Sequence, residues 1–338
     1  MLSLIKMGKL PFEEHPGKII VKKEGSTSPD YGKKPEERGI EELIDWGVIN
    51  LNKPSGPTSH QVAAYVKGIL KLDHVGHGGT LDPKVTGVLP IALEKARRIV
   101  QALLKSGKEY VCLMHIHKDV EENKLREVFE EFKGKIDQVP PVRSAVKRVK
   151  RQRRIYYLEI LEIDGKDILF RMGCEAGTYV RKLCDDIGKR LGTGAHMAEL
   201  VRTKAGPFND KTWCSLHDLK DAYEFYKEGN GEELKKIILP VEKAVEHLPK
   251  IWIFDNAVDT VCHGADLKIP GISKFSSGIN NGDMVAVMTL KNELVCLGEA
   301  LKSSEEVEKE DKGITIKTKK VFMERGIYPK FSFQDKKD

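Results

Sequence analysis

The chain has 338 residues and a formal net charge of +6, and its length favours two domains over one. It contains no run of about eighteen apolar residues and no apolar stretch near its start, so we expect no membrane-spanning helix, no membrane partner and no secretory signal. Its six cysteines include no Cys-x-x-Cys pair, which argues against a zinc site and favours free thiols in a reducing, cytoplasmic setting.

Positive charge is concentrated in one segment. Six of the eight residues from 147 to 154 are cations, whereas acidic residues gather elsewhere, as at Glu305 and Glu306. A basic cluster on so short a segment favours a polyanionic partner. The cations are Lys147, Arg148, Lys150, Arg151, Arg153 and Arg154.

Residues 1–45 are predicted to form an extension. Pro, Gly, Lys, Ser and Asp dominate from Pro16 to Gly39, and the one strand candidate is Ile19-Ile20-Val21. This composition is typical of a segment that becomes ordered only against another surface, and a disordered tail is the alternative.

The segments that follow show alternating strand and helix patterns. From Ile251 onward, short strands and turns predict a small β-barrel or sandwich of about eighty residues. The first elements expected before it are a strand at 47–51, a helix capped by Thr58 or Ser59, a helix from Leu93 to Leu104 and a strand from Lys108 to His117. A helix through Leu125 and Phe132 that ends at Gly134 and a hairpin of Ile155–Ile163 and Asp167–Met172 are expected next. They are followed by a helix capped by Thr178 and by helical segments at 216–226 and 240–247.

The stretch from Gly76 to Pro90 is the most distinctive part of the chain. It holds four glycines and two prolines in fifteen residues, which excludes the interior of a helix or of a central strand. Pro83 pushes Asp82 toward an extended or turn conformation. We predict a stiff loop that presents the Asp82 carboxylate, either as a catalytic group or as a turn former that bonds its own backbone.

Two histidines in the predicted 108–117 strand have a spacing that could hold a metal ion. Alternation places His115 and His117 on one face of the strand and Tyr110 on the other. No third ligand is evident nearby, so a solvated strand edge is the expectation and no metal site is predicted.

The Gly76–Pro90 stretch, with its pattern Gly-His-x-Gly-Thr-Leu-Asp-Pro-x-x-x-Gly-Val-Leu-Pro, resembles the catalytic loop of the TruB and dyskerin group of pseudouridine synthases. In that group the Asp is the single essential catalytic residue, and the resemblance places it at Asp82. His77 lies in the same motif and is expected to support the loop. Lys53 and Pro54, in a Lys-Pro-x-Gly-x-Thr-Ser motif that resembles the group's opening motif, are expected to support it as well.

Further motifs of this group follow in the same order. Tyr110 matches the group's active-site Tyr, which implies that it stacks on the uracil and assists removal of the C5 proton. Arg181, in Tyr179-Val180-Arg181, would hold Asp82 charged and aimed, because an adjacent cation favours the ionised carboxylate. Tyr179 and Leu200 are expected to pack against the target base.

Three parts of the chain point to one branch of the group. Pro140–Lys147 resembles the segment that precedes the group's RNA-gripping loop, but this loop is shorter and more basic than the bacterial type, so the 147–154 cations would contact RNA. The region from Ile251 resembles a PUA domain, an RNA-binding module. The chain's end lacks the long Lys-rich tail of eukaryotic dyskerins, which favours the archaeal form.

The resemblance implies an α+β fold. We expect a mixed, largely antiparallel-sheet pseudouridine synthase catalytic domain with its active site in a central cleft, and a C-terminal β-barrel PUA domain. The implied boundaries are residues 1–45 for an extension packed on the C-terminal domain, 46–248 for the catalytic domain, 249–330 for the PUA domain and 331–338 for a tail.

The implied function is isomerisation of uridine to pseudouridine in rRNA, and in tRNA as a further substrate. The chain would be the catalytic subunit of a guide-RNA-directed box H/ACA ribonucleoprotein, whose partners are a guide RNA, a substrate RNA and small accessory proteins. The reaction oxidises nothing and imports no group, so no cofactor is expected.

Three alternatives remain at this point. A stand-alone TruB-type tRNA pseudouridine synthase would use the same catalytic residues without a guide. An RNA-binding scaffold with an idle pocket is disfavoured by the joint presence of Asp82, Tyr110 and Arg181. Phosphoryl transfer on Asp82 is disfavoured because no Gly-x-x-x-x-Gly-Lys-Ser/Thr loop accompanies it. Whether Asp82 acts as nucleophile or as base stays open.

Overall fold

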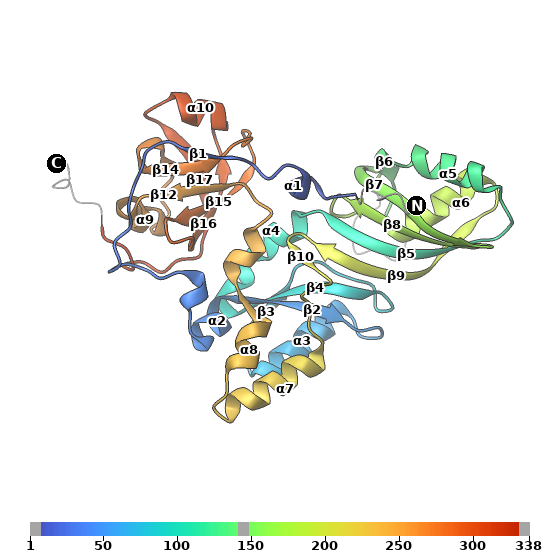
Figure 1. The fold of residues 1–338 in the computed structure, drawn as a ribbon, viewed down its shortest axis with the longest axis horizontal. Coiled ribbons are helices and arrows are strands. Elements are labelled where there is room, and N and C mark those ends of the chain that lie inside the picture. The colour runs from blue at the N-terminus through green and yellow to red at the C-terminus, as the bar shows by residue number, and fades with distance from the viewer. Residues whose placement is uncertain (1–7, 141–148, 331–338) are drawn as a thin grey trace, which may run out of the picture.

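The computed structural model describes residues 8–140 and 149–330, and Figure 1 shows them arranged in two lobes. A ten-stranded sheet runs from the centre of the molecule into one lobe, and a seven-stranded sheet forms the other. The N-terminal segment, dark blue in Figure 1, spans the distance between the two sheets. The fold class, mixed α+β with largely antiparallel sheets, is confirmed.

The ten-stranded sheet carries most of the residues discussed below. Its order is β11-β2-β4-β9-β5-β8-β7-β6, with β10 paired to β9 and β3 paired to β4. All of these pairs are antiparallel except β4 with β9. The strands are β2 (Gly47–Lys53), β3 (Val75–His77), β4 (Thr86–Leu93), β5 (Lys108–Ile116), β6 (Gly134–Gln138), β7 (Arg151–Asp164), β8 (Asp167–Cys174), β9 (Ala195–Ala205), β10 (Phe208–Asn209) and β11 (Ile238–Pro240).

Two groups of helices cover this sheet. Helices α5 (Glu122–Glu131) and α6 (Val180–Leu191) pack on the half formed by β5, β7 and β8, and enclose one apolar core. The other group packs on β2 and β4 around a second core. Its members are α2 (Ile40–Trp46), α3 (Ser59–Leu70), α7 (Leu216–Lys227) and α8 (Glu232–Ile237).

The seven-stranded sheet has the order β1-β14-β12-β15-β16-β17-β13, so a strand of the N-terminal segment forms its edge. Its strands are β1 (Ile19–Val21), β12 (Lys250–Ile253), β13 (Leu267–Lys268), β14 (Ile272–Ser276), β15 (Met284–Thr289), β16 (Leu294–Ala300) and β17 (Ile314–Val321). The remaining elements are α1 (Pro11–Glu14), α4 (Val100–Lys105), α9 (Asp255–Cys262), α10 (Ser304–Lys309) and the short 3-10 helices η1 (Pro35–Glu37), η2 (Glu94–Ile99), η3 (Val241–Val245) and η4 (Ile269–Gly271).

The prediction that the whole Gly76–Pro90 stretch is a loop was wrong at both ends, because Gly76 and His77 belong to β3 and the central strand β4 begins at Thr86 and contains Gly87 and Pro90. Pro90 is tolerated for a geometric reason. Its carbonyl accepts the Gly78 N–H at 2.8 Å, so this residue's backbone groups face β3 and not β2. The missing N–H therefore removes no hydrogen bond to Asn50, its partner on β2.

Three other predicted boundaries also differ. The expected 93–104 helix is a 3-10 helix followed by the short α4. Thr178 does not cap α6, because its hydroxyl donates to the Glu175 carbonyl at 2.7 Å and the capping position is Tyr179. Strand β7 begins at Arg151, four residues before the predicted hairpin start. The predicted cap at Thr58 is confirmed, since its side chain accepts the Gln61 N–H.

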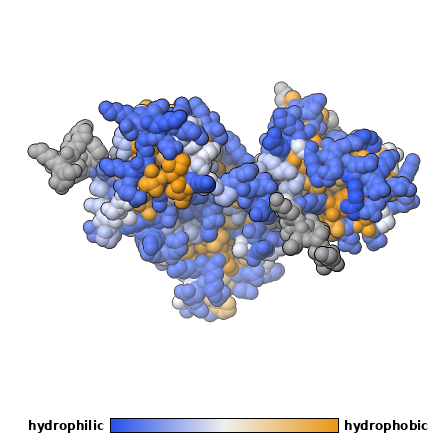
Figure 2. All heavy atoms as spheres, turned by 45° about the horizontal axis from the view of Figure 1, so that its top comes forward, coloured by the Kyte–Doolittle hydropathy of each residue, from blue (hydrophilic) through white to orange (hydrophobic). Residues whose placement is uncertain are grey.

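The surface is largely hydrophilic in the view of Figure 2, with the largest hydrophobic cluster on the lobe of the seven-stranded sheet. The exposed large hydrophobic side chains of that lobe include Ile19 and Val21 on the edge strand β1. Within residues 8–140 and 149–330, no helix is both long enough and apolar enough to cross a membrane.

Candidate active site

Asp82 lies in the loop between β3 and β4, and its two apolar neighbours anchor the loop. Leu81 and Val85 are buried and belong to the same core cluster as Tyr110 of β5 and Val180 of α6. The Asp82 side chain itself is 56% exposed. The core thus presents the carboxylate to solvent from a backbone that is held on both sides.

Arg181 approaches the loop from the first turn of α6. Its Nη2 forms a hydrogen-bonded ion pair with Asp82 Oδ2, and both side chains are about half exposed. An exposed pair of this kind stabilises a fold by only about 0.2–1 kcal/mol. Its consequence is therefore orientation of the carboxylate more than stability.

Arg202, which was not among the predicted site residues, connects Tyr110 to the loop through strand pairing. On β9, Arg202 pairs with Gly87 of β4 on one side and with Tyr110 of β5 on the other. Tyr110 is only 9% exposed. Burial raises the pKa of its hydroxyl, and the nearby Arg202 guanidinium partly offsets that rise.

Buried cations hold the loop by its carbonyl groups. Lys53 Nζ donates to the carbonyls of Pro54, Pro83 and Val85 at 2.8, 2.9 and 2.9 Å. Arg202 donates through Nε to Val88 O at 2.7 Å and through Nη2 to Gly79 O at 3.0 Å. Both cations are at most 1% exposed, so the stretch from Gly79 to Val88 is tied to the interior along its length.

A third buried cation, Lys108, lies beside the same loop. Its Nζ donates to the carbonyls of Leu103 and Ser106 at 2.8 and 2.6 Å, and its Cε lies 3.8 Å from where a Cβ on Gly79 would be. Burial lowers the pKa of Lys53, Lys108 and Arg202, that of Lys108 to about 7.

Lys53 and Arg202, together with Lys108 below about pH 7, leave positive charge uncompensated behind Asp82. In the described part of the chain, no carboxylate lies within ion-pair distance of Lys53, Lys108 or Arg202. Fixed charges of one sign create a potential that attracts the opposite sign. Here that potential favours an ionised carboxylate in the loop and phosphate groups in front of it.

Replacing Lys108 with Met is expected to change how stability depends on pH. Between pH 7 and 10.5 the unfolded chain binds a proton that folded Lys108 lacks. Stability of the wild type therefore rises with pH through this window, by about 2–3 kcal/mol between pH 7 and pH 9 from this group. Urea unfolding of both proteins at these two pH values measures the difference. Parallel pH trends in wild type and variant would contradict the assignment.

Each of the other predicted site residues has defined neighbours in the structure. The His77 ring lies edge-on to His60 at 4.8 Å, and burial lowers its pKa. Pro54 contributes its carbonyl to Lys53. Leu200 is partly buried against the core cluster of Tyr110, and Tyr179 exchanges backbone hydrogen bonds with the Gln138 side chain.

The basic run is only partly described, because Lys147 and Arg148 lie outside the described residues. Lys150 forms an ion pair with Asp137 at 2.9 Å, and Arg153 lies 3.9 Å from Glu175. Arg151, Arg153 and Arg154 belong to β7, where successive side chains point to opposite faces of the sheet. The described cations therefore do not form one continuous patch.

The two histidines with metal-like spacing have other partners. His115 Nδ1 lies 2.7 Å from Asp167 Oδ1, and His117 Nε2 lies 3.0 Å from His196 Nδ1. Among the residues that the structure describes, no group of three or more His, Cys, Asp or Glu side chains is arranged to hold a metal ion. The six cysteines are free, and all but Cys214 are buried.

Four family models match successive parts of the chain. Residues 67–180 match the TruB family pseudouridylate synthase (N terminal domain), and residues 181–246 match the tRNA pseudouridylate synthase B C-terminal domain. Residues 249–322 match the PUA domain, and residues 9–63 match the DKCLD (NUC011) domain.

Curated relatives are similar over nearly the whole chain. The probable tRNA pseudouridine synthase B of Methanopyrus kandleri is 58% identical over 323 residues, which is 95% of both chains. The protein of the same name from Pyrococcus furiosus is 59% identical over 315 residues, 92% of this chain and 93% of the relative.

Solved structures agree in fold. A chain in the crystal structure of a Cbf5-Nop10-Gar1 complex is 58% identical with a TM-score of 0.92, covering 95% of this chain and 98% of that one. A chain in the structure of an H/ACA RNP bound to a substrate RNA containing 2′-deoxyuridine is 55% identical with a TM-score of 0.90, covering 96% and 100%.

Proposed function

Because the chain belongs to the TruB family of pseudouridylate synthases, we propose that it isomerises uridine to pseudouridine in RNA as the catalytic subunit of a guide-directed H/ACA ribonucleoprotein. The observation that supports a guide-directed function is the extent of similarity to proteins from H/ACA assemblies. It covers 95–96% of the chain, so it includes the N-terminal segment as well as the catalytic region and the PUA domain.

The catalytic steps follow from the groups around the loop. In the reaction the N1–C1′ bond breaks, the base turns, a C5–C1′ bond forms, the C5 proton leaves and N1 gains a proton. Asp82 acts at the sugar, either as nucleophile on it or as base for the 2′ proton. Arg181 orients that carboxylate, and Tyr110 stacks on the uracil and assists removal of the C5 proton. Tyr179 and Leu200 pack against the base.

The target uridine has to leave its stack before Asp82 can reach the sugar, which costs a few kcal/mol. Contacts between cations and RNA phosphates offset this cost. The uncompensated charges of Lys53 and Arg202 supply attraction behind the loop. The exposed cations Lys150 and Arg154 supply it at the surface.

We propose the division of the chain into an extension (1–45), a catalytic domain (46–248), a PUA domain (249–330) and a tail (331–338). The pairing of β1 with β14 supports an extension held by the C-terminal lobe. Guide RNA, substrate RNA and small accessory proteins such as those in the similar complexes are the proposed partners. The free cysteines support a cytoplasmic setting.

Tritium release from RNA that carries uridine tritiated at C5 tests the guided reaction. The protein is combined with accessory proteins of the kinds in the similar complexes, with and without an H/ACA guide RNA. Release that depends on the guide is the expected result. Absence of release with the guide, while RNA binding is intact, would refute the proposal.

A second candidate is guide-independent modification of tRNA. It is favoured by the name of the curated relatives, probable tRNA pseudouridine synthase B. The same assay separates the two functions, because equal release from bare tRNA in the absence of guide would assign the stand-alone activity.

A further inference from the structure

The pairing of β5 with β9 contains a register shift beside Tyr110. Glu109 pairs with Lys204 and Tyr110 with Arg202, so Thr203 is an extra residue on β9. An extra residue of this kind bends the strand and re-aims its neighbours. Here the neighbours are Tyr110 and Arg202, the two residues that connect this part of the sheet to the Asp82 loop.

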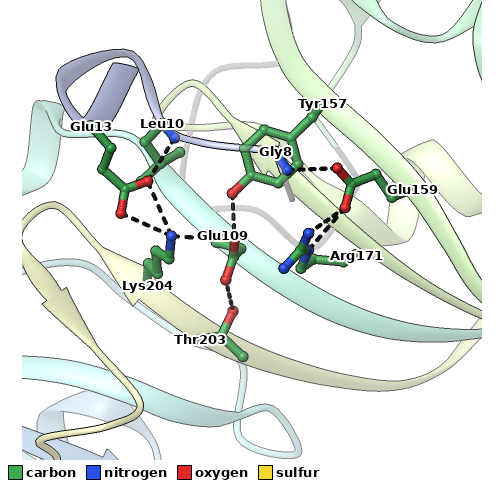
Figure 3. Close-up of polar contacts among 9 residues, drawn as sticks. All are labelled: Gly8, Leu10, Glu13, Glu109, Tyr157, Glu159, Arg171, Thr203 and Lys204. Carbon is green, nitrogen blue, oxygen red and sulfur yellow. Dashed lines mark hydrogen bonds and ion pairs between the residues drawn. The ribbon is translucent and has the colours of Figure 1, made fainter. Parts of the chain in front are cut away.

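A polar cluster holds this bulge. Figure 3 shows the Glu109 carboxylate between Tyr157 and Thr203. Glu109 is only 4% exposed; its Oε1 accepts the Thr203 hydroxyl at 2.8 Å and its Oε2 accepts the Tyr157 hydroxyl at 2.5 Å. Successive strand residues point to opposite faces, so the cluster lies behind the sheet from Tyr110.

The N-terminal segment docks on this cluster. Glu13 of α1 places its two carboxylate oxygens 2.9 and 3.0 Å from Lys204 Nζ (Figure 3), and Leu10 beside it is fully buried. The Gly8 N–H donates to Glu159 at 2.7 Å, and Glu159 pairs with Arg171. The segment is thus attached to the back of the catalytic sheet at two points, and its next element, β1, belongs to the other sheet.

Charge balance explains what Glu13 contributes. Lys204 Nζ lies between two carboxylates, close to Glu13 and 3.6 Å from Glu109 Oε2. Without the charge of Glu13, the partly buried Lys204 ammonium has Glu109 as its remaining anionic partner. It would then draw the Glu109 carboxylate toward itself and out of the position in which its oxygens accept the Tyr157 and Thr203 hydroxyls, and the bulge would lose the side-chain hydrogen bond that holds Thr203.

We propose that Glu13 is a positioning residue for uridine isomerisation. Its ion pair with Lys204 keeps the Glu109 carboxylate hydrogen-bonded to Thr203 and Tyr157. These hydrogen bonds stabilise the bulge that orients Tyr110 and Arg202 toward the loop. The inference rests on the proposed function only in assigning Tyr110 a part in the reaction. It gives the docked N-terminal segment a role in the geometry of the active site.

The test compares Glu13→Gln with Glu14→Gln in the full chain. The amide oxygen of the introduced glutamine can still accept the Leu10 N–H that Glu13 accepts at 2.8 Å, so the cap of α1 is kept while the charge is removed. Glu14 is the exposed neighbour on the same helix and is the matched control. At saturating guide and substrate RNA, E13Q is expected to slow the single-turnover rate about tenfold, with RNA affinity within about twofold of wild type, because misplaced catalytic groups cost rate more than binding. E14Q is expected to match wild type.

A spectroscopic readout follows the position of Tyr110 directly. The tyrosines are replaced biosynthetically by meta-fluorotyrosine, and the resonance of residue 110 is assigned with Tyr110→Phe. E13Q is expected to shift or broaden that resonance, and E14Q to leave it in place. An unmoved resonance in E13Q, or a rate equal to that of E14Q, would overturn the proposal. If wild type released no tritium from any RNA, the proposed function would fail, while the resonance would still decide whether Glu13 positions Tyr110.

Discussion

Replacing Asp82 with Asn is expected to abolish measurable isomerisation while the protein stays folded and binds RNA. Asparagine has the same shape and can still accept a hydrogen bond from Arg181, but it is neither a nucleophile nor a base. Loss of a general base costs about 10²–10⁴ in rate, and loss of a nucleophile costs about as much as removing the whole catalytic set. Tritium release from C5-labelled uridine at saturating guide and substrate RNA measures the effect.

This change should have little effect on the free energy of unfolding. The ion pair with Arg181 is about half exposed, so its loss should lower stability by no more than about 1 kcal/mol. Asp45→Asn is the matched control, because Asp45 is also an exposed carboxylate paired with a cation, Lys95, at 2.9 Å. If the Asp82 variant kept a rate within about tenfold of the Asp45 variant, the catalytic role of Asp82 would be wrong.

Replacing Gly87 with Ala is expected to destabilise the protein and to displace the catalytic loop. A Cβ at this position would lie 2.2 Å from the carbonyl oxygen and 2.7 Å from the nitrogen of Arg202, and both are backbone atoms of a paired strand. The φ of Gly87 is +106°, which L side chains rarely adopt. Overpacking and backbone strain each cost about 1–3 kcal/mol, so we expect a loss of about 2–6 kcal/mol in the free energy of unfolding.

Urea unfolding measures the stability of this variant, and the tritium assay measures its isomerisation rate. The close approach of β4 to β9 places the end of the loop against Arg202, so any folded variant should also have a lower rate. Gly134→Ala separates the two causes of instability, because Gly134 has a φ of +87° and open space where its Cβ would be. Equal unfolding free energies for the two variants would show that the approach to Arg202 does not matter.

Local signals were enough to predict many elements and the identity of the site. A polar cap at Thr58 and an apolar spacing of three and four around Val128 define α3 and α5, because helix formation depends on neighbours within one turn. The loop motif pointed to Asp82, and a second motif ninety-nine residues later pointed to Arg181, its partner in the structure. Such residues are visible in a sequence because their spacing within each motif is short.

The elements that sequence reasoning missed depend on pairing between distant segments. Gly87 and Pro90 are typical loop residues in the sequence, and only the pairing of their segment with β2, β3 and β9 makes it a strand. Arg202 looks like an ordinary surface cation, because the carbonyls that accept its hydrogen bonds, those of Val88 and Gly79, lie more than one hundred residues away in the sequence. No local pattern reveals the bulge at Thr203, because a register shift exists only between two paired strands. The docking of Glu13 on Lys204 is also absent from local patterns, because these residues are 191 positions apart and meet only in the folded chain.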